Sequence, residues 1–519
     1  MGVSLRVGWT TLFFSFVALA AWYSCGFFHL DEHCQIIDFF AYKKGFIPSS
    51  TLKWEYRDEI RPWLQPFLYW LSSFPIEAIF GVITPADYIR SFRFLTGFLG
   101  GCAYIFLCYQ FIRLRTATKT SSLVFLLVAF SFGLLPRFLV RTSSDNLAAI
   151  GCMSLVGAYW ATSARDRIRL WPYVLYGILC GFSFVVRFQS GIWVAGFVAW
   201  LWMFQEKRNL LSPRLWTCIA SALVATGIFL LSDRWGYGEW VFTPWRYFAT
   251  NLLHGKASSF GVSPMWGYAK LFVENFYPLG WIVLATILAF FVWKPSHLLT
   301  WMFVPFVVIH SVIPHKELRF VLFPLLYFFP IFLFELSEAW SSWVKVLARA
   351  KILHIMGLFW VGVNIYYLMG SVFFPIGPSD MYLLQELQRF RGSGPLTVYT
   401  LAPSRYGIYT LPLLDANIKR LRIFNLAYLP PSRPDIFVLR NKYTIETDTL
   451  DRKLASQGCM ILTDRYRSTP LPFIWLAENI DWVRKYTEGG LNRTLYHCGE
   501  KGSGENIASP LGSSTRSMQ

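Results

Sequence analysis

The chain has 519 residues, of which 55% are apolar and 19% aromatic, and soluble globular proteins usually carry fewer of both. This composition excludes a soluble globular protein and predicts a polytopic membrane protein. The formal net charge is +18, but most basic residues stand in short loops between apolar runs, as in membrane proteins. The charge therefore gives no reason to expect a nucleic-acid partner.

Apolar stretches of roughly 17 to 25 residues, enough for one helix to cross a bilayer, recur as far as residue 372. We predict an all-α membrane domain over residues 1–372, with about 11 transmembrane helices. The expected spans are residues 8–28, 90–112, 121–140, 143–162, 171–187, 188–205, 215–232, 277–294, 297–313, 318–337 and 351–372. A cleaved signal peptide is the alternative for the first span, and it would leave residue 29 on the same side.

The basic residues orient these spans. With the N-terminus inside, four clusters fall on the cytoplasmic side, as the positive-inside rule requires. The clusters are Arg113, Arg115 and Lys119; Arg165, Arg167 and Arg169; Lys207, Arg208 and Arg214; and Lys345, Arg349 and Lys351. The outer side then receives the first outer loop, residues 29–89, the loops 233–276 and 314–317, and the chain after residue 372.

One further apolar stretch lies inside the first outer loop, at residues 61–83. Its aromatic residues recur at helical spacing, its polar residues fall on another face, and Pro75 interrupts the run. This pattern is typical of an amphipathic helix in the membrane interface. Counting it as a span would move the following basic clusters outside, so we expect interfacial helices in this loop.

The C-terminal part is mixed polar. Residues 373–500 are predicted to form a small α/β domain on the non-cytoplasmic side, followed by a disordered tail over 501–519. Cys459 and Cys498 both lie in this domain, where a disulfide between them would be chemically allowed.

The first outer loop opens with the segment HLDEH, residues 29–33. Helical spacing from Asp31 puts Gln35 and Asp38 on one face. A carboxylate at the edge of a bilayer, partly desolvated and close to water, can act as a base or a metal ligand. The alternative is a helix N-cap. Asp31 and Glu32 are therefore candidates for a catalytic carboxylate.

Polar groups recur at four later places beside apolar runs. Three of them are TLKWEYRDEIRPW (51–63), RTSSDNL (141–147) and the pair Arg187 and Gln189. Surface salt bridges or turns would explain each of these, but ionisable groups at membrane depth usually serve a function. VIPHKELRF (312–320) brings three basic side chains together, which suits a lipid-linked phosphate. The alternative there is a charge cluster at a helix end.

These motifs resemble, in identity and order, those of glycosyltransferase family 22. The resemblance covers roughly residues 9–375 and rests on HLDE, WEYRDEIRPWLQP, RTSSDN, DRWGYGEWVFTPWRYFATN with GKASSFG, and HKELRF. Members are multispanning mannosyltransferases of the GT-C fold that use dolichyl-phosphate-mannose. Residues 233–248 look most like the members that add the third mannose of the glycosylphosphatidylinositol (GPI) anchor precursor. The sequence departs from the family pattern at four positions: Leu30, His33, Pro62 and Arg246. These departures bear on the identity of the acceptor more than on the reaction type.

The resemblance implies an inverting α-mannosyltransferase with a dolichyl- or polyprenyl-phosphate sugar as donor and a glycolipid as acceptor. It implies no metal and no cofactor. The site is expected in the lumen of the endoplasmic reticulum if the host is eukaryotic, or at the bacterial inner membrane otherwise. The implied residues are Asp31 or Glu32 as the catalytic base, His315, Lys316 and Arg319 at the donor phosphate, and His29, Arg61, Arg141, Asn146, Trp245 and Glu317 at the substrates.

Other functions stay open at this level. A related enzyme would act on the N-glycan precursor or on a bacterial envelope glycan. A multispanning transporter or lipid flippase would more often show two similar halves, and the sequence has no such internal symmetry. A membrane scaffold without enzyme activity would leave the outer-loop carboxylates dispensable.

Overall fold

The computed structural model describes the membrane domain almost throughout and the C-terminal part in pieces. The described residues are 3–23, 27–29, 31–81, 83–114, 119–162, 169–339, 352–373, 396–401, 418–423, 436–441, 452, 454–456, 459–463 and 493–498. Several predictions lie outside them: the basic residues Arg115, Arg165, Arg167, Lys345, Arg349 and Lys351, and the tail 501–519.

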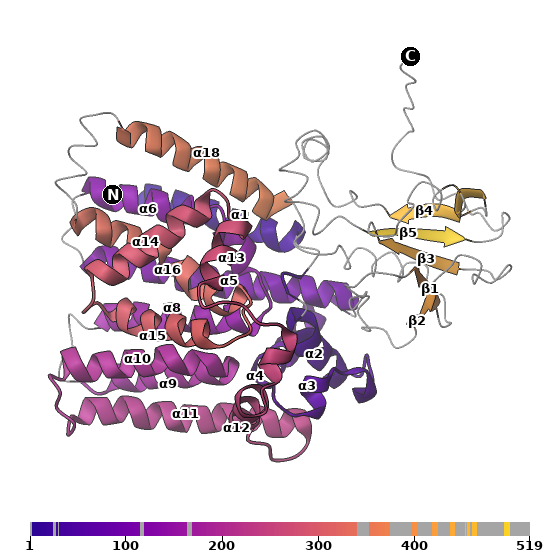
Figure 1. Cartoon of the computed structure of the whole chain (residues 1–519), viewed down its shortest axis with the longest axis horizontal. Helices are drawn as coiled ribbons and strands as arrows, with labels where there is room; N and C mark the ends of the chain where they lie inside the picture. The colour runs from indigo at the N-terminus through magenta and orange to yellow at the C-terminus, as the bar shows by residue number, and fades with distance from the viewer. Residues whose placement is uncertain are drawn as a thin grey trace.

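Helices occupy each of the predicted spans and run side by side in a bundle (Figure 1). They are α1 (Val3–Tyr23), α5 (Pro85–Leu114), α6 (Lys119–Phe130) with α7 (Leu135–Leu139), α8 (Ser144–Thr162), α9 (Trp171–Val186), α10 (Gly191–Trp200), α11 (Pro213–Tyr237), α14 (Leu279–Trp293), α15 (Leu298–Val312), α16 (Arg319–Ala339) and α18 (Ile352–Phe373).

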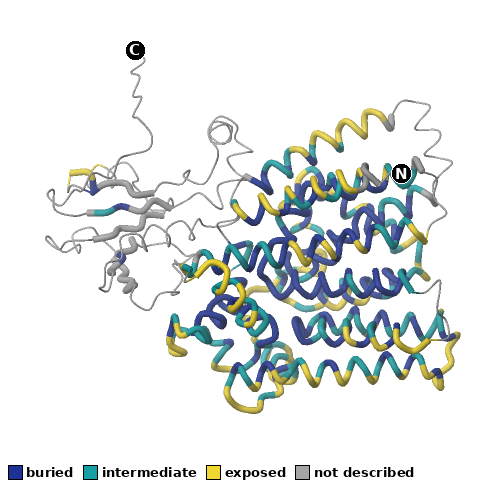
Figure 2. Tube along the Cα trace, turned by 180° about the vertical axis from the view of Figure 1, so that it is seen from behind, coloured by how far each residue is buried: buried dark blue, intermediate teal, exposed yellow. Residues whose placement is uncertain are grey.

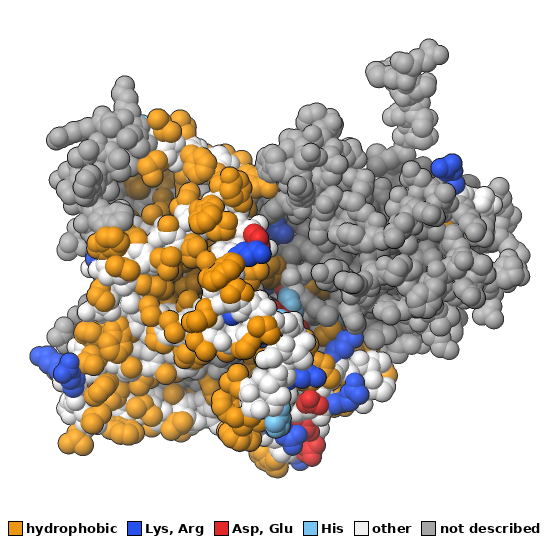
Figure 3. Space-filling model, viewed as in Figure 1, with side chains coloured by type: hydrophobic (Ala, Val, Ile, Leu, Met, Phe, Trp, Pro, Cys, Tyr) orange, Lys and Arg blue, Asp and Glu red, His pale blue; other side chains and the backbone are white. Residues whose placement is uncertain are grey.

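Four stretches in the described part of the chain are long and apolar enough to cross a membrane unaided: Asp87–Leu114, Pro213–Tyr237, Arg319–Ser337 and His354–Val372. α14 and α15, bent by 118° at a short break, pass the same test together. Apolar side chains cover the visible face of the bundle and charged ones gather toward its ends (Figure 3). These features belong to a multi-pass membrane protein, while the full number of spans stays a prediction.

One predicted span differs in an instructive way. The range 121–140 is broken between α6 and α7, because Gly133 meets the backbone of α18. Its N–H donates to Asn364 Oδ1 at 2.8 Å, and its carbonyl accepts from Ser371 Oγ at 2.6 Å. A Cβ at this position would lie 2.2 Å from the Asn364 carbonyl oxygen. The break is therefore set by a contact with a helix far away in the sequence.

α8 is the centre of the bundle, and nearly all of its side chains are buried. It packs against α5, α9 and α16, and buried residues concentrate along it while α11 and α18 carry long exposed faces (Figure 2). Exposed apolar side chains such as Leu223 and Val224 on α11 and Leu358 on α18 are what a lipid-facing helix requires.

The first outer loop folds over one end of the bundle (Figure 1). It contains a π-helical turn (Glu32–Ile37), α2 (Asp38–Lys43), α3 (Trp54–Arg57) and α4 (Leu64–Phe80). α4 is the helix predicted over 61–83. Its polar side packs inward, where Gln65 Nε2 donates to the Thr142 carbonyl at 2.9 Å, and its apolar side, with Phe74 and Ile79, is exposed. This orientation suits a helix that lies in the membrane interface.

The loop 233–276 continues from α11 into α12 (Thr243–Phe248) and α13 (Gly267–Asn275). The described C-terminal strands are β1 (Leu396–Leu401), β2 (Ile418–Ile423), β3 (Ile436–Asn441), β4 (Cys459–Thr463) and β5 (Arg493–Cys498), in the order β2-β1-β3-β5-β4. β1 runs parallel to β2 and β3, and β5 runs antiparallel to β3 and β4. Cys459 is disulfide-bonded, and Cys498 lies opposite it across the β4–β5 pair.

The close packing of α9 on α11 gives a first testable prediction. A Cβ on Gly177 would lie 2.4 Å from the Cys218 carbonyl oxygen and 2.7 Å from the Ala222 nitrogen, whereas a Cβ on Gly227 of α11 would meet nothing within 4 Å. We expect Gly177→Val to cost about 1–3 kcal/mol or more by overpacking and Gly227→Val to cost little beyond helix propensity. Thermal unfolding in detergent measures both variants, and equal melting temperatures would contradict this packing.

Candidate active site

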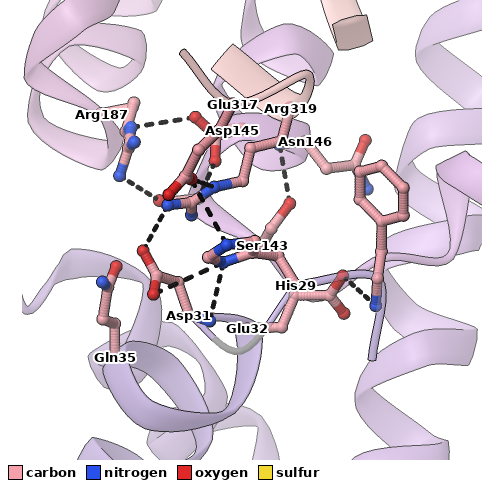
Figure 4. A network of polar contacts seen from close by, with 12 residues as sticks. His29, Asp31, Glu32, Gln35, Ser143, Asp145, Asn146, Arg187, Glu317 and Arg319 are labelled. Atoms are coloured by element: carbon pink, nitrogen blue, oxygen red, sulfur yellow. Dashed lines mark hydrogen bonds and ion pairs between the residues drawn. The ribbon is translucent and has the colours of Figure 1, made fainter. Parts of the chain in front are cut away.

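The candidate site forms where several helix ends and one loop meet (Figure 4). Asp31 directly precedes the π-helical turn, Asp145 lies in the first turn of α8, Arg187 follows the last residue of α9, and Arg319 begins α16. Wide π-helical turns are rare and often occur at functional sites. Helix ends carry unpaired backbone groups and polar side chains, so their convergence concentrates charge at one end of an otherwise apolar bundle.

Arg319 is the centre of the site, because its guanidinium contacts three carboxylates. Its Nη2 lies 2.5 Å from Asp31 Oδ2, its Nε 2.5 Å from Glu317 Oε2, and its Nη1 3.6 Å from Asp145 Oδ2. The side chain is only 4% exposed. A buried charge is tolerated only when it is paired, and the planar fork of arginine can serve several carboxylates at once.

The network extends from Arg319 in two directions. Asp145 Oδ1 also contacts Arg187 Nε at 2.9 Å. On the other side, His29 Nδ1 lies 3.5 Å from Asp31 Oδ1, and His29 Nε2 lies 3.4 Å from Glu317 Oε2. His315 Nε2 lies 2.9 Å from Glu317 Oε1. Basic and acidic side chains therefore alternate from the end of α9 to the loop before α16.

Electrostatics keep two of these carboxylates ionised. Burial alone raises the pKa of Asp31, but attraction from Arg319, from His29 and from Arg61 holds that pKa well below its usual range. Burial likewise raises the pKa of Glu317, and Arg319 and His29 offset this and lower it to about 2. Both groups are anions at neutral pH, and a carboxylate held so firmly is a weak base while its partners stay in place.

Except for Asp145, these residues line a cavity of about 870 Å³, a size suited to a substrate. The polar wall consists of His29, Asp31, Lys53, Glu55, Arg61, Arg187, Gln189, Asn251, His310, His315, Glu317 and Arg319. The apolar part is lined by Phe184, Phe188, Ile192, Tyr247, Phe248, Leu252, Phe260, Ile309, Ile313 and Phe320, among others. The cavity can therefore receive a molecule with a charged head and an apolar tail.

Six of the residues predicted from the sequence line this cavity: His29, Asp31, Arg61, His315, Glu317 and Arg319. Lys316 does not, since its Nζ donates to the carbonyl oxygens of Ser263 and Ile313 at 3.1 and 2.9 Å. Trp245 does not line the cavity either: its side chain is 57% exposed and packs against Phe248, which does. The roles assigned to all of these residues stay predictions.

Glu32, Arg141 and Asn146 form a second, fully buried network beside the cavity. Glu32 Oε1 accepts from the Phe28 N–H at 3.1 Å, and Glu32 Oε2 lies 4.0 Å from Arg141 Nη1. Asn146 Nδ2 donates to the Arg141 carbonyl at 2.7 Å, and its Oδ1 accepts from Tyr327 OH at 2.5 Å. This arrangement ties the first outer loop to α8 and α16, so of the two candidate carboxylates only Asp31 faces the cavity.

Asp145, Arg187, Lys53 and Glu55 belong to the cavity or its network but were not selected as site residues from the sequence. Asp145 stands in the RTSSDN motif beside the predicted Asn146, and Glu55 stands in WEYRDEIRPW with the predicted Arg61, so both belong to motifs that the sequence singles out. The available signal was an acidic residue in the first turn of an apolar helix, which is rare unless it is paired. Among the described residues, no group of three or more His, Cys, Asp or Glu side chains is arranged to hold a metal ion.

Known proteins resemble the chain in sequence and fold. The model of the Alg9-like mannosyltransferase family matches residues 9–393. A Schizosaccharomyces pombe protein described as a probable Dol-P-Man:Man(7)GlcNAc(2)-PP-Dol alpha-1,6-mannosyltransferase is 30% identical over 129 residues, 24% of this chain and 22% of that protein. Mannosyltransferase APTG1 of Arabidopsis thaliana is 25% identical over 304 residues, 57% of this chain and 52% of that protein. The alignments thus span about a fifth and about half of these relatives' lengths.

Among solved structures, the fold is similar to that of ArnT from Cupriavidus metallidurans bound to undecaprenyl phosphate, with a TM-score of 0.55. The match covers 97% of this chain and 99% of that protein at 13% sequence identity, which establishes a shared fold. This match confirms the expected class of fold, a helical membrane bundle. Because the family model covers most of the sequence, the family expected from the motifs is confirmed as well, and the chain belongs to the Alg9-like mannosyltransferase family.

Proposed function

We propose that the protein transfers mannose from a polyprenyl-phosphate carrier, dolichyl-phosphate-mannose in a eukaryotic host, to a hydroxyl of a lipid-linked glycan. The observation that carries this proposal is Asp31 on the polar wall of the cavity, in contact with Arg319 at 2.5 Å. Support also comes from the family description and from the S. pombe relative, whose description names a Dol-P-Man donor. The undecaprenyl phosphate bound to ArnT agrees with a carrier lipid in this fold.

In the proposed reaction, Asp31 accepts the proton of the acceptor hydroxyl while its oxygen attacks C1 of the donor sugar. The bond between C1 and the phosphate oxygen breaks, the configuration at C1 inverts, and the carrier leaves as polyprenyl phosphate. Basic groups on the cavity wall, chiefly Arg61, His315 and Arg319, stabilise the negative charge that develops on the phosphate. With this leaving group no general acid, metal or cofactor is needed.

The carboxylates that already contact Arg319 suggest that the donor must bind before Asp31 can act as a base. Each of its three nitrogens contacts a carboxylate, so a donor phosphate must compete for it. Once the phosphate draws on Arg319, attraction between Arg319 and Asp31 weakens and the pKa of Asp31 rises toward its usual value. The donor would thereby convert a weak base into a useful one only when C1 is in place.

The GPI-anchor precursor is the acceptor that we propose, with addition of its third mannose in the lumen of the endoplasmic reticulum. A second candidate is the N-glycan precursor, which the description of the S. pombe relative as an alpha-1,6-mannosyltransferase favours. Profiling of lipid-linked glycans after loss of the protein separates them. We expect a GPI precursor with two mannoses to accumulate, whereas a truncated N-glycan precursor would support the second candidate.

Replacement of the base tests the chemistry. We expect Asp31→Asn to lower kcat by about 10²–10⁴-fold, the usual contribution of general-base catalysis, with binding of dolichyl phosphate retained. Transfer of radiolabelled mannose from dolichyl-phosphate-mannose to membrane glycolipids measures the rate. Asp58→Asn is a matched control, since Asp58 is exposed in the same loop. Wild-type rates in Asp31→Asn would overturn the assignment of the base.

The pH profile tests the electrostatics. Because His29 helps to lower the pKa of Asp31, His29→Asn is expected to raise that pKa. Asp31 acts as a base only when ionised, so the acid limb of the kcat/KM profile should move to higher pH in the variant. His254→Asn, at an exposed histidine of the other outer loop, is the control. A shift to lower pH, or no shift, would show that His29 does not act on Asp31.

A further inference from the structure

Glu55 is a second carboxylate on the cavity wall, and the reaction outlined above gives it no role. It lies on α3 in the first outer loop and is 8% exposed. Its Oε1 accepts from Gln35 Nε2 at 3.2 Å. Arg61 Nη2 lies 4.0 Å from Glu55 Oε1 and 3.7 Å from Asp31 Oδ2. The two carboxylates therefore flank one guanidinium nitrogen, and a single sugar ring can reach both.

The charge on Glu55 is less well balanced than that on Asp31. Arg319 contacts Asp31 at 2.5 Å, whereas Arg61 stands at the limit of an ion pair with Glu55. Burial raises the pKa of Glu55, and Arg61 and the Gln35 hydrogen bond offset this only in part. A carboxylate accepts several hydrogen bonds when ionised, so Glu55 keeps acceptor capacity directed at the cavity.

The surroundings of Glu55 are those of a sugar site. Trp54 and Phe260, which both line the cavity, stack with ring centroids 6.2 Å apart and an interplanar angle of 28°. Lys256 Nζ lies 5.0 Å from the centre of the Trp54 ring and holds this platform from one side. A hexose presents apolar C–H faces to aromatic rings and hydroxyl groups to carboxylates and amides. A carboxylate, the Arg61 guanidinium and two aromatic rings thus line the same cavity as Asp31.

We infer that Glu55 binds the acceptor sugar of the proposed reaction, by accepting hydrogen bonds from the hydroxyls next to the one that attacks. Gln35 is the positioning residue that orients the Glu55 carboxylate, and Arg61 sets its separation from Asp31. Glu55 thereby selects which hydroxyl faces Asp31, and with it the linkage that is formed. A sugar that lacks the neighbouring hydroxyl would displace water from Glu55 without replacing its hydrogen bond, and a polar site selects strongly against such a loss.

Steady-state kinetics of Glu55→Gln with dolichyl-phosphate-mannose and a synthetic alkyl mannoside acceptor test this inference. We expect the acceptor KM to rise about 10- to 100-fold, as loss of hydrogen bonds to a charged group implies, while the donor KM stays unchanged. Glu274→Gln is the matched control, because Glu274 is an exposed glutamate of the outer loop. A raised donor KM, or a fall in kcat alone as large as that of Asp31→Asn, would overturn the role in acceptor binding.

Monodeoxy analogues of the acceptor give a second measurement. Removal of the hydroxyl that Glu55 binds should weaken the acceptor strongly with the wild type and hardly further with Glu55→Gln, whereas removal of other hydroxyls should act equally on both. Gln35→Met should show the same acceptor-specific loss and keeps the test informative if Glu55→Gln fails to fold. Equal losses for every analogue with both proteins would contradict the inference.

The inference rests on the proposed function, so binding of the alkyl mannoside is also measured directly without donor. Tighter binding to the wild type than to Glu55→Gln would support the sugar site even if no mannose transfer is detected, in which case the proposed reaction alone would fail. Mannose transfer with equal acceptor binding in both proteins would instead overturn the role of Glu55 and leave the reaction standing.

Discussion

A buried guanidinium with three carboxylates around it is the constraint on which the site depends. Arg319 cannot be buried at the end of α16 without partners, and its partners come from the first outer loop, from the first turn of α8 and from the loop before α16. Each contact therefore fixes a separate segment against the same group. This explains why Asp31 is held at a defined position although it lies in the first outer loop.

The same cluster divides the cavity by chemistry. Its polar wall holds basic and acidic groups, and its apolar wall includes aromatic and aliphatic side chains of α9, α10, α12, α15 and α16. A substrate with a charged or polar head and a hydrocarbon chain fits both walls at once, whereas a wholly polar or wholly apolar molecule would leave one wall unsatisfied. The division suits the lipid-linked sugars of the proposed reaction, with the phosphate proposed to bind near Arg61 and Arg319 and the acceptor sugar near Trp54 and Glu55.

Much of this was predictable from the sequence, for physical reasons that also mark the limits. Spans such as α11 and α16 follow from hydropathy, because the bilayer demands apolar length, and Asp31 and Arg319 stand out as ionisable residues beside apolar runs. The break at Gly133 depends on Asn364, 231 positions away, which no local pattern contains. Asp31 and Glu32 are neighbours with equal chemistry, and only the fold shows that one faces the cavity and the other Arg141. Likewise, only the fold shows that the Arg319 side chain lines the cavity while the Lys316 side chain binds backbone carbonyls instead.

Asp31 and Arg319 are 288 positions apart in the chain, and this separation has a consequence for biosynthesis. The first outer loop is made early, yet its central carboxylate acquires its arginine only after α16 has been synthesised and inserted. Until then Asp31 keeps its charge in water or takes up a proton, and the loop lacks the contact that fixes it. The ion pair therefore couples the final shape of the earliest outer segment to the completion of nearly the whole membrane domain, so a chain that stops before α16 would carry the HLDE motif without the arginine that completes the candidate site.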